Sequence, residues 1–503
     1  MKRILVLFLG IIVCLSGCTM APKYNRPGAP IPDHWPSGAA YSQAQTAASV
    51  PDVTQLKWQE FFTDSRLQKI IKTALHNNRD LRIAALNVER ARALYGIRRA
   101  ELLPVVNAEA GYSKQRYSSD FVAPGASKTI KQYSVDLGIA AWEIDFFGRI
   151  RSLGKQALEE YLATEEARSS AQILLVSSVA NAYLALAADR ENLALAQSTL
   201  QNQSSAYNLV QRQYTLEIAN ELDLNRAKTP VEIARRDIAL YTQLVAQDQN
   251  ALNLLVGSSV PEDLLPADLA SVSPTKDISI GLSSEVLLRR PDIMAAEHQL
   301  KGAYANIGAA RAAFFPSISL TTTLGSASNQ FSGLFKGGKG TWSYAPQIVM
   351  PIFDPHTWFA YRVSKADQKI ALTQYEKAIQ TAFKEVADAL AVRGTVGQQV
   401  AAQQSLVDTA AETYRLSNSR YMKGIDSYLG VLDAQRSLFA AQQVLVYLRQ
   451  AKLANQVHLY AVLGGGGLDE MYGWKRANRD FIEEETLSFL RADESLKGNN
   501  RHH

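Results

Sequence analysis

Two halves of the 503-residue chain repeat each other. Matching residues lie 212 positions apart in the first stretch of the repeat and 207 positions apart further along. A constant offset that changes once indicates tandem duplication with one change of loop length. We therefore predict two copies of one unit, at 58–257 and 280–464, with a linker at 258–279, in place of the three unrelated domains that length alone suggests. The matched pairs include Asp80/Asp292, Gly96/Gly308, Arg99/Arg311 and Pro104/Pro316 at the first offset, and Val179/Val386, Tyr214/Tyr421, Ile218/Ile425 and Gly257/Gly464 at the second.

Each copy contains two segments in which apolar residues alternate with small or polar ones. They lie at about 104–117 and 130–143 in the first copy, and at about 316–326 and 341–352 in the second. A period of two over about ten residues is typical of a membrane β-strand. A soluble β-sandwich is the alternative, but the small uncharged residues of the polar face suit the lining of a lumen. Aromatic residues stand where interfacial girdles are expected: Tyr112, Tyr117, Tyr133, Trp142, Trp342 and Tyr344.

The rest of each copy is predicted to be helix of unusual length. Residues 155–256 contain no glycine and a single proline, Pro230. Apolar residues recur there every seven positions, which predicts supercoiled packing against a partner helix: Val179, Leu186, Leu193, Leu200, Tyr207 and Tyr214. Sixty helical residues form a rod of roughly 90 Å, longer than a bilayer is thick. A coiled-coil scaffold without strands would show the same heptads, so this alternative stays open at this point.

The N-terminus has the pattern of a secretory signal peptide at residues 1–17. Lys2 and Arg3 precede an apolar stretch, Ile4–Leu15, that is too short to span a bilayer. The stretch ends in Leu-Ser-Gly-Cys18, which resembles a bacterial lipobox and predicts a covalent lipid on Cys18. An ordinary signal peptide with a chance cysteine is the alternative. Thr19 follows where inner-membrane lipoproteins often carry Asp, which favours the outer membrane, and the proline-rich residues 18–57 are interpreted as an extended tether.

Four strands per chain are too few to close a membrane sheet. An open edge in lipid leaves backbone N–H and C=O groups unpaired, so membrane sheets must close. Bacterial barrels begin at about eight strands, so the chain must share a barrel with copies of itself. A dimer gives eight strands and a filled interior, whereas a trimer gives twelve and leaves room for a channel. These arguments alone do not choose between the two.

Other classes of function find little support in the sequence. The two cysteines, Cys14 and Cys18, both lie at the N-terminus, so the body has no disulfide framework and no thiolate site. The histidines form no His-Glu-x-x-His pattern, and no Gly-x-Ser-x-Gly motif occurs, so we expect neither a metal site nor a catalytic centre. The net charge of +5 is spread along the chain, which argues against a nucleic-acid partner. No uninterrupted apolar run of eighteen residues follows residue 20, and no transmembrane helix is expected there.

Several motifs resemble those of TolC-type outer-membrane factors, in their NodT-like lipoprotein branch. Residues 287–297 read LLRRPDIMAAE, and residues 307–320 read IGAARAAFFPSISL. Trp58 with Phe61 and Asp64, residues 142–151 and residues 428–436 agree with the same family, and the resemblance covers about residues 20–465. Residues 465–503 form a tail to which no role is assigned.

The resemblance implies a mainly α fold with membrane β-structure. Three identical chains should form a twelve-stranded barrel across the outer membrane, continuous with a twelve-helix α-barrel in the periplasm. Such a homotrimer is the exit duct of a tripartite efflux pump for drugs or other small molecules. Its expected partners are a periplasmic adaptor (membrane fusion) protein, an inner-membrane efflux transporter and outer-membrane lipid. The rival interpretation is a lipid-anchored, non-conducting periplasmic coiled-coil structural protein.

The resemblance also implies a gate at the periplasmic helix tips. Leu429 and Asp433 match positions that narrow the tunnel in the family, whereas Gly430 stands where many relatives carry a second acid. The equivalent positions in the first copy give Leu222, Asp223 and Arg226. Our hypothesis is that Arg226 pairs with Asp433, or with another tip acid such as Asp223, to hold the closed state. The alternative is that these are merely solvated charges, since exposed ion pairs contribute only ~0–1 kcal/mol.

Overall fold

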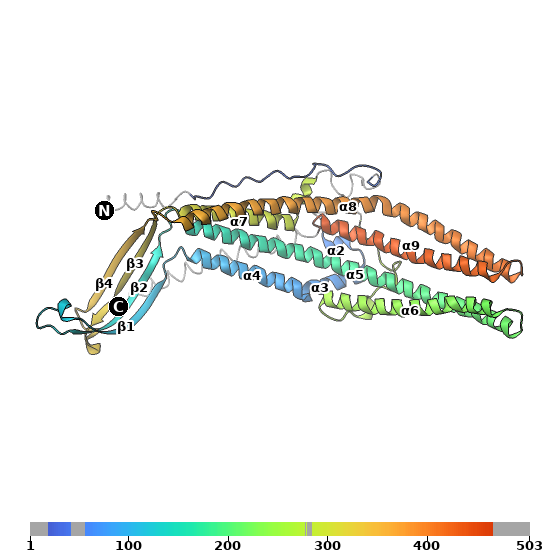
Figure 1. The fold of residues 1–503 in the computed structure, drawn as a ribbon, viewed down its shortest axis with the longest axis horizontal. Helices are drawn as coiled ribbons and strands as arrows, with labels where there is room; N and C mark the ends of the chain where they lie inside the picture. The colour runs from blue at the N-terminus through green and yellow to red at the C-terminus, as the bar shows by residue number, and fades with distance from the viewer. Residues whose placement is uncertain (1–18, 42–55, 277, 279–283, 466–503) are drawn as a thin grey trace, which may run out of the picture. The chain divides into compact units, whose positions relative to one another are not determined.

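The computed structural model describes residues 19–41, 56–276, 278 and 284–465 (Figure 1). The predicted signal peptide, the predicted lipidation site Cys18 and nearly all of the predicted tail lie outside these residues. The chain divides into two compact units. Unit 1 combines Met1–Gly28, Leu86–Glu165 and Ala295–Lys377, and unit 2 combines Ala29–Ala85, Glu166–Met294 and Ala378–His503.

Unit 1 contains a four-stranded antiparallel sheet in the order β1-β2-β3-β4 (Figure 1). The strands are β1 (Val106–Arg116), β2 (Thr129–Glu143), β3 (Ser317–Ser328) and β4 (Gly340–Val349). Short 3-10 helices, η2 (Ser119–Phe121) and η5 (Phe331–Gly333), lie in the two hairpin loops. The four strands expected from the alternating pattern are therefore confirmed, and β1 and β4 are the two open edges of the sheet.

The strand register places most apolar residues of the four strands on one face, with Ile130 and Val349 as exceptions on the other. Leu137 lies opposite Ala108 on one side and Leu324 on the other, and Leu324 lies opposite Trp342. The neighbouring row on the other face contains Glu109, Asp136 and Gly325. The apolar face comprises Val106, Ala108, Ala110, Tyr112, Tyr133, Val135, Leu137, Ile139, Ile318, Leu320, Thr322, Leu324, Trp342, Tyr344, Pro346 and Ile348.

A β-bulge in β2 keeps the apolar face continuous. The register shifts between Ile139 and Trp142, and Ala141 within the bulge has a φ of 48°. The backbone N–H of Ala141 donates to the Thr321 hydroxyl at 3.1 Å. The extra residue returns Trp142 to the apolar face, opposite Leu320, where regular alternation would have placed it on the polar face.

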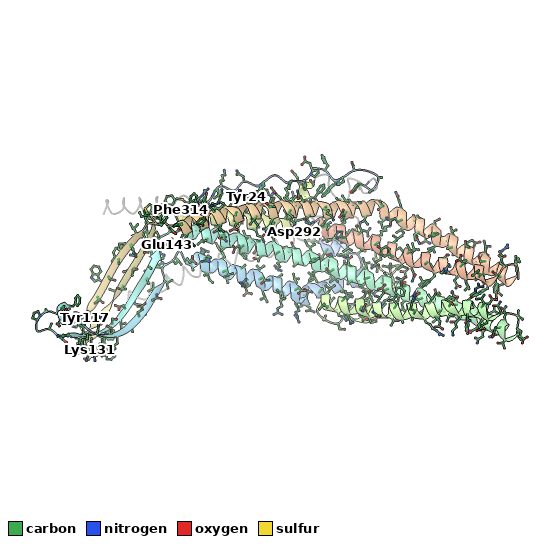
Figure 2. All side chains as sticks on the ribbon, in the orientation of Figure 1. Tyr24, Tyr117, Lys131, Glu143, Asp292 and Phe314 are labelled. Atoms are coloured by element: carbon green, nitrogen blue, oxygen red, sulfur yellow. The ribbon has the colours of Figure 1, made fainter. Side chains whose placement is uncertain are left out.

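Helices join the sheet of unit 1 at the end away from the hairpin loops. α4 (Arg79–Ala100) and α7 (Pro291–Ala312) lead into β1 and β3, while α5 (Arg149–Thr215) and α8 (Pro355–Met422) follow β2 and β4. Figure 2 shows Glu143 and Phe314 near these junctions, with Tyr117 and Lys131 near the loops. Glu143 receives two hydrogen bonds from the Arg149 guanidinium, at 2.6 and 2.9 Å, and so ties the end of β2 to the start of α5.

Unit 2 is helical. Its hairpins combine α5 with α6 (Glu221–Val256) and α8 with α9 (Tyr428–Val462), and both turns lie at the same end of the unit (Figure 1). The short helices α2 (Trp58–Phe61) and α3 (Ser65–Asn77) lie at the opposite end of the hairpins. Trp58 and Phe61 of α2 enter the core, where the ring of Phe61 stacks on Tyr460 with centroids 4.1 Å apart. The 3-10 helix η3 (Glu262–Leu264) belongs to the segment between the repeats, and η4 (Ser284–Arg289) lies at the start of the second copy.

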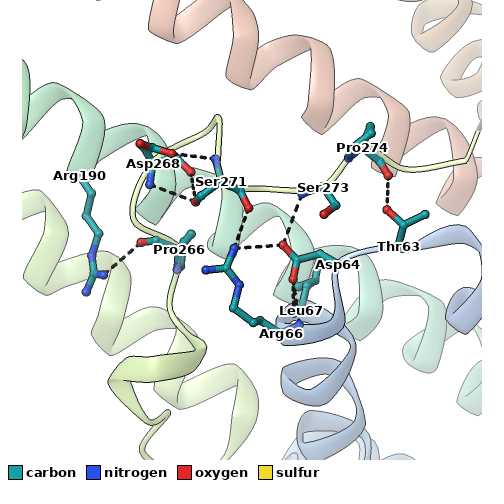
Figure 3. Close-up of polar contacts among 10 residues, drawn as sticks. All are labelled: Thr63, Asp64, Arg66, Leu67, Arg190, Pro266, Asp268, Ser271, Ser273 and Pro274. Atoms are coloured by element: carbon teal, nitrogen blue, oxygen red, sulfur yellow. Dashed lines mark hydrogen bonds and ion pairs between the residues drawn. The ribbon is translucent and has the colours of Figure 1, made fainter.

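Asp64, one of the residues that carried the family resemblance, attaches the segment between the repeats to α3 (Figure 3). Its carboxylate accepts hydrogen bonds from the backbone N–H groups of Arg66 and Ser273, at 2.9 and 3.4 Å. The Arg66 guanidinium in turn donates to the carbonyl oxygen of Ser271 at 2.7 Å. Asp64 therefore caps the N-terminus of α3 and fixes the neighbouring loop at the same time.

One described helix, α5, is long and apolar enough to cross a membrane by length and composition. Its most apolar window has a mean hydropathy of 1.6, although the sequence there contains no uninterrupted apolar run of eighteen residues. More than half of that window, 56%, is buried inside the structure. We attribute its apolar character to core packing, because Val179, Tyr183 and Leu186 are fully buried.

Candidate functional site

Two tight turns close the helical hairpins, and they share one backbone geometry at equivalent positions of the repeat. Glu217 and Gly424, 207 positions apart, both adopt the left-handed region, with φ of 56° and 68°. In each turn the next residue donates its backbone N–H to a carbonyl five positions earlier, Ile218 to Gln213 and Ile425 to Arg420. The duplication has therefore preserved the turn, while only the second copy uses the glycine that this conformation favours.

Side-chain contacts brace the second turn and link the two hairpins. The Arg420 guanidinium pairs with Asp426 across the turn, and this hydrogen bond holds the pKa of the Asp426 carboxyl below its usual value. The Tyr421 hydroxyl donates to the side-chain oxygen of Gln213 at 3.2 Å, joining α8 to α5. The rings of Tyr421 and Tyr428 lie 5.0 Å apart, and burial raises the pKa of Tyr428 to about 12. Sequence reasoning singled out neither the Arg420–Asp426 pair nor the contact between the hairpins.

The predicted gate residues lie next to these turns, on α6 and α9. Arg226, Leu429 and Asp433 line one groove of about 880 Å³ that is open to solvent and is also bordered by α5. Leu222 and Asp223 lie in the first turn of α6 and are not among its lining residues. The structure therefore brings three of the five residues together around a single groove.

Within one chain, the charges of the predicted gate pair locally. The Arg226 guanidinium lies 3.7 Å from the Asp223 carboxylate, one turn earlier on α6. Asp433 accepts a hydrogen bond from Arg436 at 2.7 Å, and both side chains are largely exposed. The two predicted partners of Arg226 are Asp433 and Asp223. In the structure, Asp223 lies at ion-pair distance from it. Arg436 also lines the groove and was not among the predicted gate residues, although its i,i+3 spacing from Asp433 on one helix indicates such a pair.

The polar face of the sheet is a second candidate site. Glu109 and Asp136 lie directly opposite each other on β1 and β2, and Asp136 lies opposite Gly325 on β3. A Cβ atom at Gly325 would come within 2.2 Å of the Asp136 carboxylate, so glycine leaves the space that this side chain occupies. Apart from Glu143 near the junction with α5, the remaining polar-face residues of the four strands are uncharged and many are small, which suits the lining of an aqueous lumen. No group of three or more His, Cys, Asp or Glu residues arranged to hold a metal ion occurs in the described residues.

The N-terminal segment lies against α7 in unit 1. The carbonyl oxygen of Met20 accepts a hydrogen bond from Arg311 at 3.2 Å. Ala21 packs so closely on Gly308 that a Cβ atom at position 308 would lie 2.8 Å from it. Further along, the Arg26 guanidinium and the Tyr24 hydroxyl both donate to the Glu297 carboxylate. Gly308, Arg311 and Glu297 all belong to the motifs that carried the resemblance, and these contacts give a physical reason for them.

Charge compensation keeps Glu297 ionised beneath this segment. Burial opposes ionisation, but hydrogen bonds from Lys301 and Arg26 outweigh it and hold the pKa of the Glu297 carboxyl below its usual value. Lys301 lies 3.0 Å from Glu297 on the same helix. Arg26 reaches Glu297 from 271 positions away in the sequence, a separation that leaves no periodic trace in the sequence.

Comparison with known proteins identifies the family. The model of the family described as "Outer membrane efflux protein" matches residues 70–258 and 282–465. Two relatives from Pseudomonas putida are each 48% identical over 91% of this chain and 94% of their own length: the antibiotic efflux pump outer membrane protein ArpC and the toluene efflux pump outer membrane protein TtgC. The crystal structure of the open state of the Neisseria gonorrhoeae MtrE outer membrane channel matches with a TM-score of 0.80 and 38% identity, over 89% of this chain and 98% of that one.

These matches confirm the family and the fold that the motifs suggested, and they favour the channel over the non-conducting spacer. The family is one of channels, and its members named above reside in the outer membrane. The chain therefore belongs to the outer membrane efflux protein family and is an outer-membrane protein.

Proposed function

We propose that three copies of this chain form one barrel that serves as the exit duct of a tripartite efflux pump. The observation that carries the proposal is the sheet of unit 1, which has one apolar face, one polar face and two open edges, β1 and β4. Open edges are costly in lipid, so the sheet must be completed by other chains. Identical copies can do this by pairing β4 of one chain with β1 of the next.

The polar face favours a trimer over a dimer. The interior of an eight-stranded barrel is filled by its own side chains, whereas twelve strands enclose a wider lumen. Small side chains predominate on this face, beside larger polar ones such as Glu109, Gln132 and Asp136. The small ones include Gly111, Ser113, Ser134, Gly138, Thr321, Thr323, Gly325, Ser343 and Ala345. Of the two assemblies, the twelve-stranded barrel with a wet lumen is therefore the one that fits these residues.

Apolar residues on the helices of unit 1 support the same assembly. Leu94 and Ile97 on α4, and Trp358, Phe359 and Val363 on α8, are 45–61% exposed in the single chain. Large apolar side chains gathered on helix faces are typical of a protein–protein interface. We infer that α4 and α8 contribute to the contact between neighbouring copies.

We infer that the tips of unit 2 face a periplasmic adaptor protein. Apolar residues around both turns are exposed in the single chain: Leu216, Ile218, Leu222, Met422, Ile425 and Leu429. An adaptor that covers these residues would connect the duct to an inner-membrane efflux transporter. Substrate choice would then belong to the transporter, and this division agrees with relatives that are equally similar to this chain but are named for antibiotic and toluene efflux.

The docked N-terminal segment supports a lipid anchor on Cys18. Met20, two positions after Cys18, is held by Arg311 at the end of α7, immediately before β3 enters the proposed barrel. Two residues of extended chain span at most ~7 Å, so an acyl chain on Cys18 would lie at the periplasmic rim of the sheet. This is the level at which the inner leaflet of the outer membrane meets the barrel.

We propose that Arg226, Leu429 and Asp433 narrow the duct at the tips, with Leu222 and Asp223 beside them. In the proposed trimer each groove residue occurs three times, and small shifts of α6 and α9 would change the partners of Arg226 and Asp433. The variant with Arg226→Ala and Asp433→Ala should raise conductance in planar bilayers. Arg235→Ala combined with Glu232→Ala removes an exposed pair of similar geometry, 3.0 Å apart on α6, and should leave conductance unchanged. Equal conductance in both double variants would contradict the gate.

Native mass spectrometry and planar-bilayer recording of the lipidated chain test the duct itself. We expect a trimer that carries covalent acyl chains on Cys18 and conducts ions. A stable monomer or dimer, or a trimer without conductance, would overturn the proposal. The variant Cys18→Ser separates the two parts, because it should lose the acyl mass while the trimer purified in detergent still conducts.

A further inference from the structure

Three basic side chains lie on the apolar face of the sheet, at its loop end. Lys114 on β1 is directly opposite Lys131 on β2, and Arg116 follows two positions beyond Lys114. They stand in the same alternating rows as Tyr112 and Tyr133, which are also directly opposite each other with ring centroids 4.7 Å apart. We call Lys114, Arg116 and Lys131 the basic cluster.

The basic cluster has no compensating charge on its own face. Within the described residues, none of its three side chains makes a hydrogen bond or an ion pair. The acidic residues of β1 and β2, Glu109, Asp136 and Glu143, lie on the polar face. Like charges directly opposite each other on a sheet are destabilising, so the Lys114–Lys131 pair is unfavourable for the sheet alone.

The second hairpin shows that the fold does not require these bases. At the positions 212 further on, Ser326 and Ser328 replace Lys114 and Arg116. Ser326 also faces the apolar side, opposite Val135 and Gly340. The same hairpin is thus built without a basic cluster, and we infer that the cluster serves a purpose other than folding.

The depth of the cluster follows from the apolar band beneath it. From Trp142 to Tyr133 the apolar face of β2 lies opposite Leu320 to Ser328 of β3, so with the bulge it covers eight strand steps. This is about 26 Å of strand, and about 20 Å along the membrane normal at a tilt of ~40°. That height is close to the apolar band of ~25 Å in outer-membrane barrels. Phe331 from the second loop packs on Tyr133 with ring centroids 5.7 Å apart, as part of an aromatic girdle. The basic cluster therefore lies just beyond the girdle, at headgroup level.

We propose that the basic cluster binds the phosphate groups of lipopolysaccharide, the phosphorylated glycolipid of the outer leaflet. The assignment rests on the proposed barrel, because the loop end of the sheet faces outward only if the helices extend into the periplasm. Phosphate supplies the negative charge that the face lacks. The directly opposite Lys114 and Lys131 have Cβ atoms about 5 Å apart, close enough for both ammonium groups to contact one phosphate. Arg116 adds a planar fork that can bind the same phosphate or the next one.

A variant in which neutral residues replace the basic cluster tests the site against a matched control. Lys114→Gln, Arg116→Gln and Lys131→Gln together remove three positive charges from the apolar face. Lys128→Gln, Lys336→Gln and Lys339→Gln remove the same number from the loops at the same end. Lys128 extends the polar face, because it lies opposite Tyr117, one step beyond the Arg116–Thr129 pair of the apolar face. Lys339 also extends the polar face, because it lies one step beyond Gly340.

The measurement is binding of bis-phosphorylated lipid A to the full-length trimer in nanodiscs. Each basic residue near an anionic lipid contributes roughly fivefold to the affinity. We therefore expect the affinity for lipid A to fall roughly a hundredfold in the cluster variant and little in the control. Dephosphorylated lipid A, phosphatidylglycerol and inorganic phosphate distinguish the possible sources of phosphate, and each should bind the wild type more weakly than the phosphorylated glycolipid. Equal loss in both triple variants, or phosphatidylglycerol binding as tightly as lipid A, would overturn the assignment.

Two further measurements separate the proposed lipid site from the proposed barrel. Heat-modifiable trimers and single-channel conductance report the barrel, and both should be unchanged in the cluster variant. An intact, conducting barrel that binds lipid A equally well with and without the cluster would refute the lipid site alone. A cluster variant that retains wild-type lipid A binding in native mass spectra of the purified trimer would refute it as well.

Discussion

The proposed barrel predicts that one lysine has opposite consequences on the two faces of β2. Leu137 lies near the middle of the apolar band, between Ala108 and Leu324, and is 56% exposed in the single chain. Ser134, three positions earlier on the same strand, lies on the polar face opposite Gly111 and Ala327. Leu137→Lys therefore places an ammonium group in hydrocarbon, whereas Ser134→Lys places it in the lumen.

The magnitude follows from the depth of the residue. A lysine at the bilayer midplane of a barrel costs ~2–4 kcal/mol, and the cost falls towards zero near the interfaces. Three copies in one trimer give roughly 6–12 kcal/mol for Leu137→Lys. The lumen side chain of Ser134→Lys remains hydrated, and Asp136 lies two positions away on the same face. We therefore expect little loss of stability from Ser134→Lys, together with a shift of ion selectivity towards anions.

The assay is heat-modifiable trimer in outer-membrane fractions, followed by conductance of the purified protein. Leu137→Lys should abolish or strongly reduce the trimer, and Ser134→Lys should leave its amount near that of the wild type. Leu137→Met is the control for loss of the leucine side chain, and it should assemble normally. Equal assembly of the two lysine variants would refute the assignment of faces, and with it the barrel.

Two other predictions concern the helical hairpins of unit 2. Burial, followed by the charge of Asp189, raises the pKa of Asp248 to about 6, so the folded state binds this proton more tightly and the free energy of unfolding should fall as pH rises from about 4 to about 6. Asp248→Asn should remove this fall and stabilise the protein by ~1 kcal/mol at pH 8, below the ~3 kcal/mol that the full shift implies because solvent screens a partly exposed pair. Thermal unfolding at pH 5 and pH 8 measures this, with the exposed Asp388→Asn as control, and an equal pH profile for the wild type and Asp248→Asn would contradict it. At the hairpin turns, Glu217→Gly should raise the free energy of unfolding by up to ~1 kcal/mol and Gly424→Ala should lower it by ~1–2 kcal/mol. Urea titration of the helical signal tests the pair, and a loss of stability in Glu217→Gly would show that Glu217 makes a compensating contact.

Local patterns predicted the strands and helices because each residue's neighbours in the sequence decide them. The alternation through Val106, Tyr112 and Tyr133 gave both the strands and the correct apolar face. It could not give the bulge at Ala141, because that extra residue is set by the partner strand, where Thr321 accepts its N–H. Without the bulge, simple alternation places Trp142 on the wrong face.

Contacts between distant residues were beyond the reach of sequence patterns. Glu297 was known only as part of a motif, and nothing in the sequence indicated that Arg26 and Tyr24 would reach it. The predicted gate residues lie beside the hairpin turns, since the motif places Leu429 and Asp433 and the repeat offset carries them onto the first copy. Their pairing was not determined, since helical spacing brings Arg226 close to Asp223 but does not show whether Asp433 of the other hairpin competes for it.

Differences between the two copies indicate where function has been added to the duplicated unit. Equivalent positions carry opposite charges at the tips, Arg226 in the first copy and Asp433 in the second. In a trimer the two copies alternate around the axis, so six such positions would alternate in sign. Alternating charges attract their neighbours around a ring, whereas six like charges would repel one another and favour an open tip. In the proposed trimer, divergence of the duplicated unit at this position would therefore supply a closing force that a ring of identical units could not provide.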